Sequence, residues 1–374
     1  MPGKDVDLVV IGAGLSGCAL VAALRRRGWC GTVHILEAGR GPGGRCATRR
    51  RRDDPLWRLD HGSPTLSFQA EPSGQLRELI TSLENRGVVR VDHDPVVGLD
   101  HHGDVVEAPD HPLLRGPRWR GIPTMATVVE TLLADGGKDV DACFGERVQT
   151  LSRVEESWVF AGGLRAERLV LSGTLLAHPR SLAMLGWQDV PLREAVPHGH
   201  DPVLDEALAW IAGLNATIRW NLMLEFPAID LDPFPRQIWL TPQAQQQFGV
   251  ERIVLQRQQQ GRLGLVLHGL DDGALITPKT QPLLLTAQEQ RLLSVLPELL
   301  RPWPSLQRLA SSAHSLGVMR WGAAQPLDRG MSKALQWCNQ ARVGFCGDWI
   351  AGSGFGMAEG ALQSSIDLAE SIAP

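Results

Sequence analysis

The chain has 374 residues, of which 43% are hydrophobic and 21% are charged, and its formal net charge is −4. This length predicts about two domains, and the apolar fraction is enough for a full-sized core. Because neither sign of charge dominates, the composition favours neither a nucleic-acid-binding nor a membrane-surface protein. The six cysteines include no CxxC pair, so we expect reduced thiols, with no disulfide framework and no metal site.

The apolar run over residues 6–24 is similar in composition to a signal peptide or a membrane span. However, Asp5 and Asp7 stand where a signal peptide would carry positive charge, and three glycines interrupt the run. A strand, a glycine turn and a helix account better for this pattern. We therefore expect a cytoplasmic protein with no integral membrane segment.

The first elements are predicted in the order strand, helix, strand. Residues 7–11 are a short apolar run bounded by glycine, which is typical of a buried parallel strand. Residues 15–27 predict a helix that stops at Gly28, and residues 32–36 predict the next strand. Together they indicate the beginning of a βαβ unit.

The rest of the chain predicts further elements of both kinds. Alternating apolar residues with turns between them indicate an antiparallel sheet in the middle of the chain, over residues 218–226, 237–240, 252–256 and 263–269. Outside this sheet we expect helices over 73–86, 124–135, 286–300 and 356–372, a hairpin over 96–107, and strands over 147–152, 158–160, 168–172 and 342–347. The start of the third of these helices is placed by a capping box, Thr286 to Glu289.

These elements predict an α/β fold with two parts. A three-layer, Rossmann-like domain is expected to bind a dinucleotide, and an inserted α+β domain built on the antiparallel sheet is expected to bind the substrate. We assign residues 1–70, 120–190 and 328–374 to the first domain, and residues 71–119 and 191–327 to the second.

The turn after the first strand carries Gly12, Gly14, Leu15, Ser16 and Gly17. In such a GxGxxG turn, the first glycine permits the tight turn, the second lets the backbone approach a pyrophosphate, and the third allows close helix–strand packing. The helix N-terminus adds unpaired N–H groups and the positive end of the helix dipole. Since the turn follows a strand and opens a helix, it predicts a dinucleotide site.

An acidic residue and a second glycine pair follow at the expected distance. Glu37 lies 20 residues after the last glycine of the turn, with Ala38 beside it. A carboxylate there accepts hydrogen bonds from ribose hydroxyls and repels a 2′-phosphate. Further on, Gly43 and Gly44 let the backbone pass close to a cofactor, and Arg45 offers a fork for phosphate or carbonyl oxygens.

Three segments carry a resemblance to a known family. The string around Gly43-Gly44-Arg45, which ends at Thr48, resembles the second glycine motif of the flavin amine oxidase superfamily. Asp60-His61-Gly62 is similar to a segment of the renalase-like branch of that superfamily. Near the C-terminus, Gly347-Asp348 and Met357-Ala358 resemble the superfamily's last flavin-binding segment.

The resemblance implies FAD as a non-covalent cofactor, since Cys346 is better explained as a core residue than as an attachment point. It implies that Asp348 contacts the ribityl chain, and that the helix beginning at Met357 and Ala358 points its N-terminus at the flavin pyrimidine edge. It also implies a backbone contact from Val148 to adenine. The cofactor residues implied in this way further include Thr48, His61 and Gly62.

Candidate catalytic residues come from the segment Asp60-His61-Gly62 and from one further block. The block Met319-Arg320-Trp321 resembles one near the end of the renalase substrate domain, and His61 belongs to the segment expected near the flavin ring. We therefore take His61, Arg320 and Trp321 as candidates. For His61, a hydrogen-bonding role is an equal alternative.

The expected function is oxidation of a small molecule by hydride transfer to flavin N5, with O2 as acceptor. The renalase resemblance implies misreduced NAD(P)H isomers as substrates. Flavin amine oxidation is the alternative, but the chain has no tyrosine for the usual aromatic cage, which leaves Trp220, Trp239, Trp321 and Phe355. A prenyl- or carotenoid-type desaturase and a non-catalytic binding protein on the same fold remain open, and the sequence indicates no protein partner and no nucleic acid.

Overall fold

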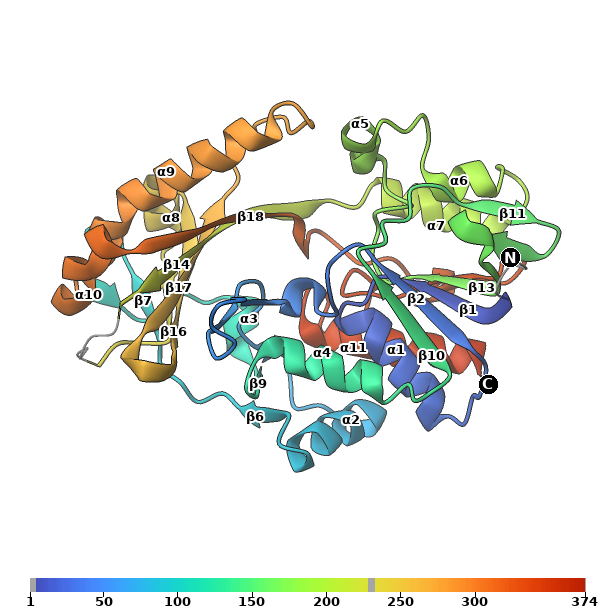
Figure 1. The fold of residues 1–374 in the computed structure, drawn as a ribbon, viewed down its shortest axis with the longest axis horizontal. Coiled ribbons are helices and arrows are strands. Elements are labelled where there is room, and N and C mark those ends of the chain that lie inside the picture. Colours follow the sequence, from blue (N-terminus) through green and yellow to red (C-terminus); the bar gives the residue numbers. More distant parts are fainter. Residues whose placement is uncertain (1–4, 228–232, 374) are drawn as a thin grey trace.

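The computed structural model describes residues 5–227 and 233–373, which form two sheets with helices packed around them (Figure 1). The first sheet has a parallel core in the order β10-β2-β1-β13-β20. These strands are β1 (Asp5–Ile11), β2 (Val33–Glu37), β10 (Val140–Phe144), β13 (Arg165–Leu171) and β20 (Val343–Phe345). Short antiparallel strands extend it, namely β11 (Ser152–Val154), β12 (Ser157–Val159) and β19 (Trp337–Cys338).

Helices cover both faces of this parallel core, which is why its strands are almost continuously apolar. One face carries α1 (Leu15–Arg26), α4 (Met125–Ala134) and α11 (Ala358–Ile372), with α2 (Gly74–Asn85) beside them. The other face carries α5 (Leu182–Leu185), α6 (Pro191–Ala195) and α7 (Pro202–Ala212), together with β11 and β12. The result is the predicted three-layer arrangement. Since β1 lies between β2 and β13, the turn after β1 stands at the point where the strand order reverses.

The second sheet has the order β18-β14-β17-β16-β15-β7-β8 and is antiparallel except for the parallel pair β15 and β7. Its strands are β7 (Val96–Leu99), β8 (Val105–Val106), β14 (Ala216–Phe226), β15 (Gln237–Leu240), β16 (Val250–Arg257), β17 (Leu263–Leu270) and β18 (His314–Pro326). Its outer face packs on α8 (Pro242–Phe248), α9 (Gln281–Leu299) and α10 (Pro304–Leu309). Its inner face turns toward the first sheet.

Small elements join the two parts. A ribbon of β3 (Thr48–Arg50) and β4 (Arg58–Asp60) follows the second glycine segment. A three-stranded sheet is formed by β5 (Leu66–Ser67), β6 (Val89–Val91) and β9 (Arg118–Gly121), and the short helix α3 (Pro112–Arg115) precedes β9.

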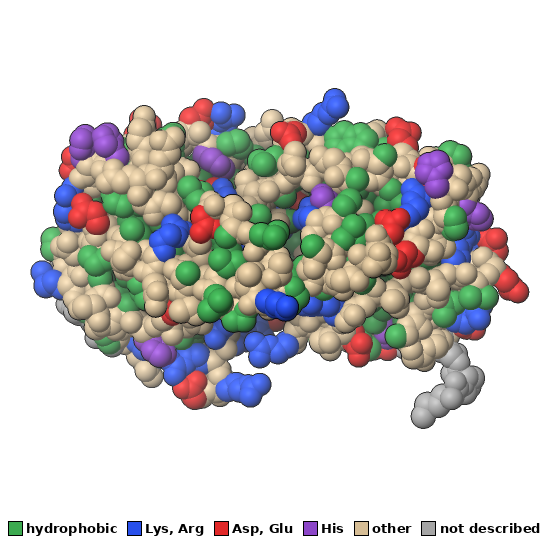
Figure 2. Space-filling model, turned by 90° about the horizontal axis from the view of Figure 1, so that it is seen from above, with side chains coloured by type: hydrophobic (Ala, Val, Ile, Leu, Met, Phe, Trp, Pro, Cys, Tyr) green, Lys and Arg blue, Asp and Glu red, His purple; other side chains and the backbone are tan. Residues whose placement is uncertain are grey.

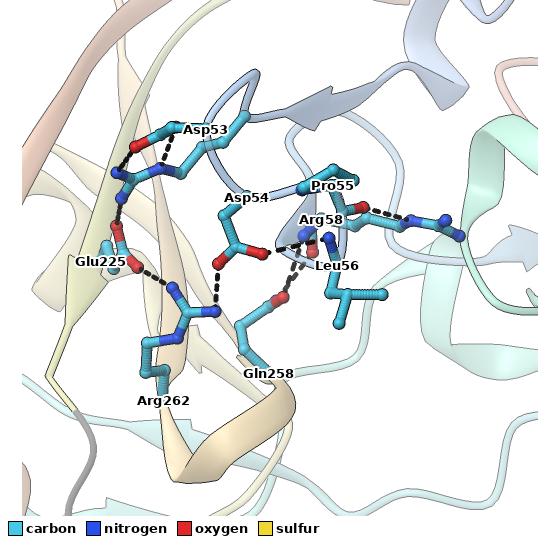
Figure 3. A network of polar contacts seen from close by, with 9 residues as sticks. Asp53, Asp54, Pro55, Leu56, Arg58, Glu225, Gln258 and Arg262 are labelled. Carbon is cyan, nitrogen blue, oxygen red and sulfur yellow. Dashed lines mark hydrogen bonds and ion pairs between the residues drawn. The ribbon is translucent and has the colours of Figure 1, made fainter.

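A buried carboxylate on the second sheet anchors the loop between β3 and β4 (Figure 3). The carboxylate of Glu225 on β14 accepts from Arg51 at 2.6 Å and from Arg262 at 3.0 Å. Arg51 and Arg262 also bind Asp53 and Asp54 of the loop. Because Glu225 is buried and bonded to both arginines, this network is a polar joint between the two parts and not a loose surface pair.

Side-chain amides extend the same joint. Gln256 of β16 donates to the carbonyl of Asp60 at 2.7 Å and accepts from its N–H at 2.9 Å. Gln258 pairs in the same way with the backbone of Arg58. Each glutamine side chain therefore makes the two hydrogen bonds to the β4 backbone that a residue of a neighbouring strand would make.

Two predicted elements differ from the structure, and one strand was not predicted. The strand expected over 147–152 does not form, and β11 begins only at Ser152. The helix expected from Thr286 begins at Gln281, and the Thr286 hydroxyl donates back to the Pro282 carbonyl, as an interior helix residue does. The long strand β18 was not predicted, because glycines interrupt its alternation and its pairing with β14 supplies what its own pattern lacks.

Two segments pack differently from the expected domain boundaries. Apolar residues of α2 lie in the core shared by α1 and α11, although residues 71–119 were assigned to the second domain. Likewise α6 and α7 pack against the first sheet, although the second domain was expected to resume at residue 191. Each of these helices packs where its apolar face is buried, which is against the core of the first sheet. A domain boundary placed at the end of a strand pattern does not detect this packing.

Candidate functional site

A cavity of about 980 Å³, including its open mouth, lies between the C-terminal edge of the first sheet and the inner face of the second. Both parts of the chain line it. From the first come Leu15, Ser16, Arg45, Cys46, Gly62, Ser63, Thr65, Ser67, Ser172, Asp348, Gly356, Met357, Ala358 and Ala361. From the second sheet and α3 come Leu113, Thr217, Arg219, Asn221, Glu251, Arg252, His268, Trp321, Ala324 and Gln325.

The two glycine segments meet beside this cavity, and the residues that follow them, Leu15, Ser16, Arg45 and Cys46, line it. Gly14 and Gly43 form a β-bridge, and the Gly43 N–H donates to the Ala13 carbonyl at 2.8 Å. A Cβ on Gly44 would lie 3.1 Å from the Cα of Gly14. A Cβ on Gly17 would lie 2.1 Å from the Gly12 carbonyl oxygen. The sequence needs glycine here because backbone passes against backbone, as the motif predicted.

Two helix N-termini open onto the same space. The N-caps of α1 and α11 are Gly14 and Met357, and neither makes a side-chain capping bond. First-turn N–H groups of both helices therefore remain available to a ligand, apart from that of Gly360, which donates to the Gly354 carbonyl at 3.1 Å. Two positive dipole ends directed at one cavity favour a ligand with negative charge at two places.

Arg45 and Asp348 form one unit, although separate roles were expected for them. The two guanidinium nitrogens of Arg45 donate to the two carboxylate oxygens of Asp348 at 2.5 and 2.6 Å. Arg45 also donates to the Ala324 carbonyl at 3.0 Å, which connects the pair to β18. The adjacent carboxylate raises the pKa of Arg45, so the guanidinium remains charged. The Asp348 side chain is only 4% exposed, and both residues line the cavity.

Other predicted cofactor residues lie away from the cavity. Glu37 accepts from the Ala13 N–H at 2.8 Å and from the Gly39 N–H at 2.6 Å, and so fixes the glycine turn at its outer side. Ala38 is exposed beside it, and Val148 lies outside any strand, half-buried against the core below the first sheet. Thr48 binds Asp60 and the N–H of Ala126.

Strand alternation separates two of the three candidate catalytic residues, Arg320 and Trp321. Trp321 lines the cavity, whereas Arg320, its neighbour on β18, lies over the Trp220 ring at 5.4 Å. Trp220 belongs to the core beneath α9, so the side chain of Arg320 lies on the outer face of the sheet. Its position gives no support to a catalytic role.

His61 lies behind the cavity wall and not on it. Its ring stacks on Trp321 at 5.7 Å, and its carbonyl accepts from Asn221 at 2.7 Å. Burial lowers the pKa of His61 to about 4, so its imidazole is neutral at pH 7. Its Nδ1 is buried without a hydrogen-bond partner. A stacking and positioning role fits this environment better than proton transfer.

Sequence reasoning missed the polar wall of the second sheet, which we define as Arg219, Asn221, Glu251, Arg252 and His268. All five side chains line the cavity and are buried or nearly so. Polar residues at alternate positions of 216–226 were the only signal available, and they did not reveal which face the alternation exposes.

Of the four aromatic residues considered for a substrate cage, Trp321 is the one that lines the cavity among the described residues. Trp220 faces the α9 core, and Trp239 lies beneath Arg252. A pair of facing aromatic rings is therefore not formed by these candidates.

Asp60 lies next to the site and gives a pH-dependent prediction. Burial raises the pKa of its carboxyl to about 6, although Thr48 donates to it at 2.6 Å and the Met125 N–H at 3.1 Å. As pH rises from 4 to 6, the unfolded chain ionises first, so the folded state loses stability, by about 1.4 kcal/mol per pKa unit and roughly 2–3 kcal/mol in all. Asp60→Asn is expected to remove this loss.

The measurement is urea unfolding of the wild type and of Asp60→Asn at pH 4.5 and pH 7.5. The comparison is needed because His61, with its lowered pKa, gains stability over the same window and masks the effect in the wild type alone. The variant should gain roughly 2 kcal/mol on the wild type between the two pH values. An equal pH dependence of both proteins would contradict the prediction.

Comparison with known proteins supports this fold. The family described as "NAD(P)-binding Rossmann-like domain" matches residues 10–83. No curated protein gives a significant match. Cyclohexylamine oxidase from Brevibacterium oxydans is similar over 99% of both chains, with 17% identity and a TM-score of 0.64. Putrescine oxidase, solved bound to putrescine, is similar over 99% of both chains, with 15% identity and a TM-score of 0.59.

An oxidoreductase from Methanosarcina mazei is similar over 98% of this chain and 100% of its own, with 12% identity and a TM-score of 0.62. At these identities the likeness establishes the fold, and the predicted fold class is confirmed. None of the helices in residues 5–227 and 233–373 has the length and apolarity needed to cross a membrane. Figure 2 shows charged side chains of both signs spread among apolar ones over the face seen from above.

Proposed function

We propose that this protein is an FAD-dependent oxidoreductase acting on a small molecule. The observation that carries the proposal is the convergence of two helix N-termini without side-chain caps and two closely apposed glycine segments on one cavity. This arrangement provides a place for a pyrophosphate at the N-terminus of α1. It provides a place for a flavin ring, which carries negative charge when reduced, at the N-terminus of α11. Cyclohexylamine oxidase and putrescine oxidase, which have this fold, are named as oxidases.

The residues present fit FAD in four places. The cradle at Gly14 and Gly44 would receive the pyrophosphate, because a side chain at either position would fill it. Glu37, at the outer side of the turn, would accept a ribose hydroxyl with its remaining lone pairs. The Arg45–Asp348 unit would face the ribityl chain, and the N-terminus of α11 would face the pyrimidine edge of the ring.

When bound, FAD supplies a two-electron acceptor for a hydride leaving a substrate carbon, with O2 as the final acceptor. The chain's own residues bind and orient. The hydroxyls of Ser63, Thr65 and Ser67 and the ring of Trp321 line the space between the cradle and the second sheet. Burial lowers the pKa of His268 well below its usual value, so this cavity-lining imidazole is neutral. A hydride donor such as a dihydropyridine needs no base.

Among substrates, the renalase resemblance favours misreduced NAD(P)H isomers over amines. The absence of tyrosine and the single cavity-lining candidate ring, Trp321, weaken the amine alternative, since no aromatic pair is formed by the candidate residues in the described part of the chain. We place the protein in the cytoplasm, in keeping with its N-terminal strand–turn–helix.

The test is the visible spectrum of the purified protein. A flavin band near roughly 450 nm, released on denaturation, is expected for a non-covalent flavoprotein. A colourless protein that also fails to take up added FAD would overturn the proposal. Anaerobic bleaching of the bound flavin by 2- or 6-dihydronicotinamide isomers, compared with bleaching by benzylamine, then separates the two substrate classes.

A further inference from the structure

Three charged side chains belong to the polar wall of the second sheet. Arg219, Glu251 and Arg252 all line the cavity. They come from two strands that are not neighbours, β14 and β16, with β17 and its His268 between them. This places a charged cluster in the same cavity as Leu15, Ser16, Met357 and Ala358 at the N-termini of α1 and α11.

A β-bulge turns two consecutive residues toward the cavity. The pairing of β16 with β17 shifts between Val250 and Arg252, so Glu251 is an additional residue in its strand. In a regular strand, Glu251 and Arg252 would point to opposite faces. Bulges of this kind redirect side chains and are frequent beside active sites.

The cluster carries one net positive charge. Glu251 accepts from Arg219 at 2.5 Å, and its other oxygen lies 3.9 Å from Nε of Arg252. The nearby arginines and this hydrogen bond lower the pKa of Glu251 despite its burial, so it remains ionised. The neighbouring imidazoles His268 and His111 have pKa values lowered by burial and add no charge.

Arg252 is the member of the cluster whose charge is not matched. The residue is 9% exposed, and its Nε has no hydrogen-bond partner. The 3.9 Å separation from Glu251 exceeds hydrogen-bond length. Its guanidinium lies over the Trp239 ring, 4.7 Å from the centroid, and this stacking holds it in place. A buried cation in this state is costly unless a ligand supplies the missing acceptor.

We propose that the polar wall binds the carboxylate of a monoanionic substrate, with Arg252 as the main contact and Arg219 as its neighbour. This inference rests on the proposed FAD-dependent oxidation of a small molecule in the same cavity. It assigns that substrate a carboxylate, in place of the NAD(P)H isomers that the resemblance implies, which carry a pyrophosphate and no carboxylate. A guanidinium binds a carboxylate through two parallel hydrogen bonds, which orients the molecule as well as holding it. One net charge matches a carboxylate better than a doubly charged phosphate.

The same charge acts against amines. A cationic ammonium in this cavity would lie near two guanidinium groups with only one carboxylate to balance them. Arg219 and Arg252 would then select against the substrate class of a typical amine oxidase.

The experiment is calorimetric titration of the FAD-loaded protein at pH 7.5 with four small probes: sodium benzoate, benzamide, benzylamine and inorganic phosphate. Benzoate is expected to bind. Benzamide is expected to bind at least about tenfold more weakly than benzoate, and benzylamine to show no measurable binding. The same titrations with sodium acetate test whether the ring of benzoate is too large. If neither carboxylate binds more tightly than benzamide, or if phosphate binds most tightly, the proposal is wrong.

Three variants test the residues. Arg252→Met should weaken benzoate binding by about tenfold to hundredfold. Arg257→Met removes an exposed arginine from the same strand and should leave benzoate binding within about twofold of the wild type. Glu251→Gln raises the net charge of the wall and should tighten benzoate binding, a gain that a damaged fold would not produce. Unchanged binding in both Arg252→Met and Glu251→Gln would overturn the assignment.

The two proposals fail separately. A protein that shows no flavin spectrum and takes up no added FAD refutes the proposed function, while benzoate titration of the FAD-free chain still tests the polar wall. A yellow protein in which benzoate, acetate and their controls behave alike refutes the polar wall alone.

Discussion

Gly14→Ala is expected to weaken FAD binding by about a hundredfold, or ~2.7 kcal/mol, while the protein without cofactor stays folded. The nearest atom to a Cβ at this position is the Cα of Gly44, at 3.8 Å, which is an ordinary contact. The protein itself therefore has room for the methyl group. The group would occupy the cradle where the backbone approaches the pyrophosphate. Loss of the glycine N-cap costs a further ~1 kcal/mol of folding stability or less.

FAD affinity is measured by quenching of flavin fluorescence, and folding by circular dichroism and urea unfolding. Gly28→Ala, at the opposite end of α1, is the matched control. Its φ of +79° strains an alanine, but no atom lies within 4 Å of the new Cβ. We expect it to lose about 1 kcal/mol of stability and to keep its FAD affinity. If Gly14→Ala binds FAD as the wild type does, the pyrophosphate does not lie at this turn.

Arg45→Met should lower the free energy of unfolding of the FAD-free protein by about 3 kcal/mol. The substitution leaves the Asp348 carboxylate, 4% exposed, without the two hydrogen bonds that Arg45 donates. Removing the partner of a buried carboxylate costs more than the pair itself contributes, because an uncompensated buried charge remains. Arg45→Lys should recover part of the lost stability, since a single ammonium restores the positive charge but not both hydrogen bonds of the guanidinium.

Urea unfolding at pH 7.5 measures this effect. Arg49→Met provides the control, because Arg49 is an exposed residue of the adjacent ribbon and should change stability by less than about 0.5 kcal/mol. The prediction fails if Arg45→Met and Arg49→Met unfold at the same urea concentration. The double variant Arg45→Met with Asp348→Leu should be more stable than Arg45→Met alone, since no unpaired charge is then buried.

The sequence by itself predicted the features that depend on local geometry. Gly17, Gly43 and Gly44 have close backbone contacts that leave little or no room for a side chain, so the motif could be read without the fold. The parallel strands were visible because helices bury both of their faces and leave continuous apolar runs. The alternation of the second sheet likewise indicated strands, although glycines concealed β18.

The tertiary structure decided what depends on which face of an element is covered. Arg320 and Trp321 are neighbours in one block, yet only Trp321 reaches the cavity, because successive strand residues point to opposite faces. Sequence cannot tell which of the two faces α9 covers. The pairing of Arg45 with Asp348, residues 303 positions apart, is likewise a product of the fold.

The polar wall shows the same limit most clearly. Glu251 and Arg252 are adjacent in sequence and would point to opposite faces of a regular strand. A bulge that exists only in the pairing of β16 with β17 turns both to the cavity. The glycine turn therefore indicated where we propose that a dinucleotide binds. The charge of the opposite wall, which we propose selects the substrate, arises from strand register, and register is set by long-range pairing and not by local sequence.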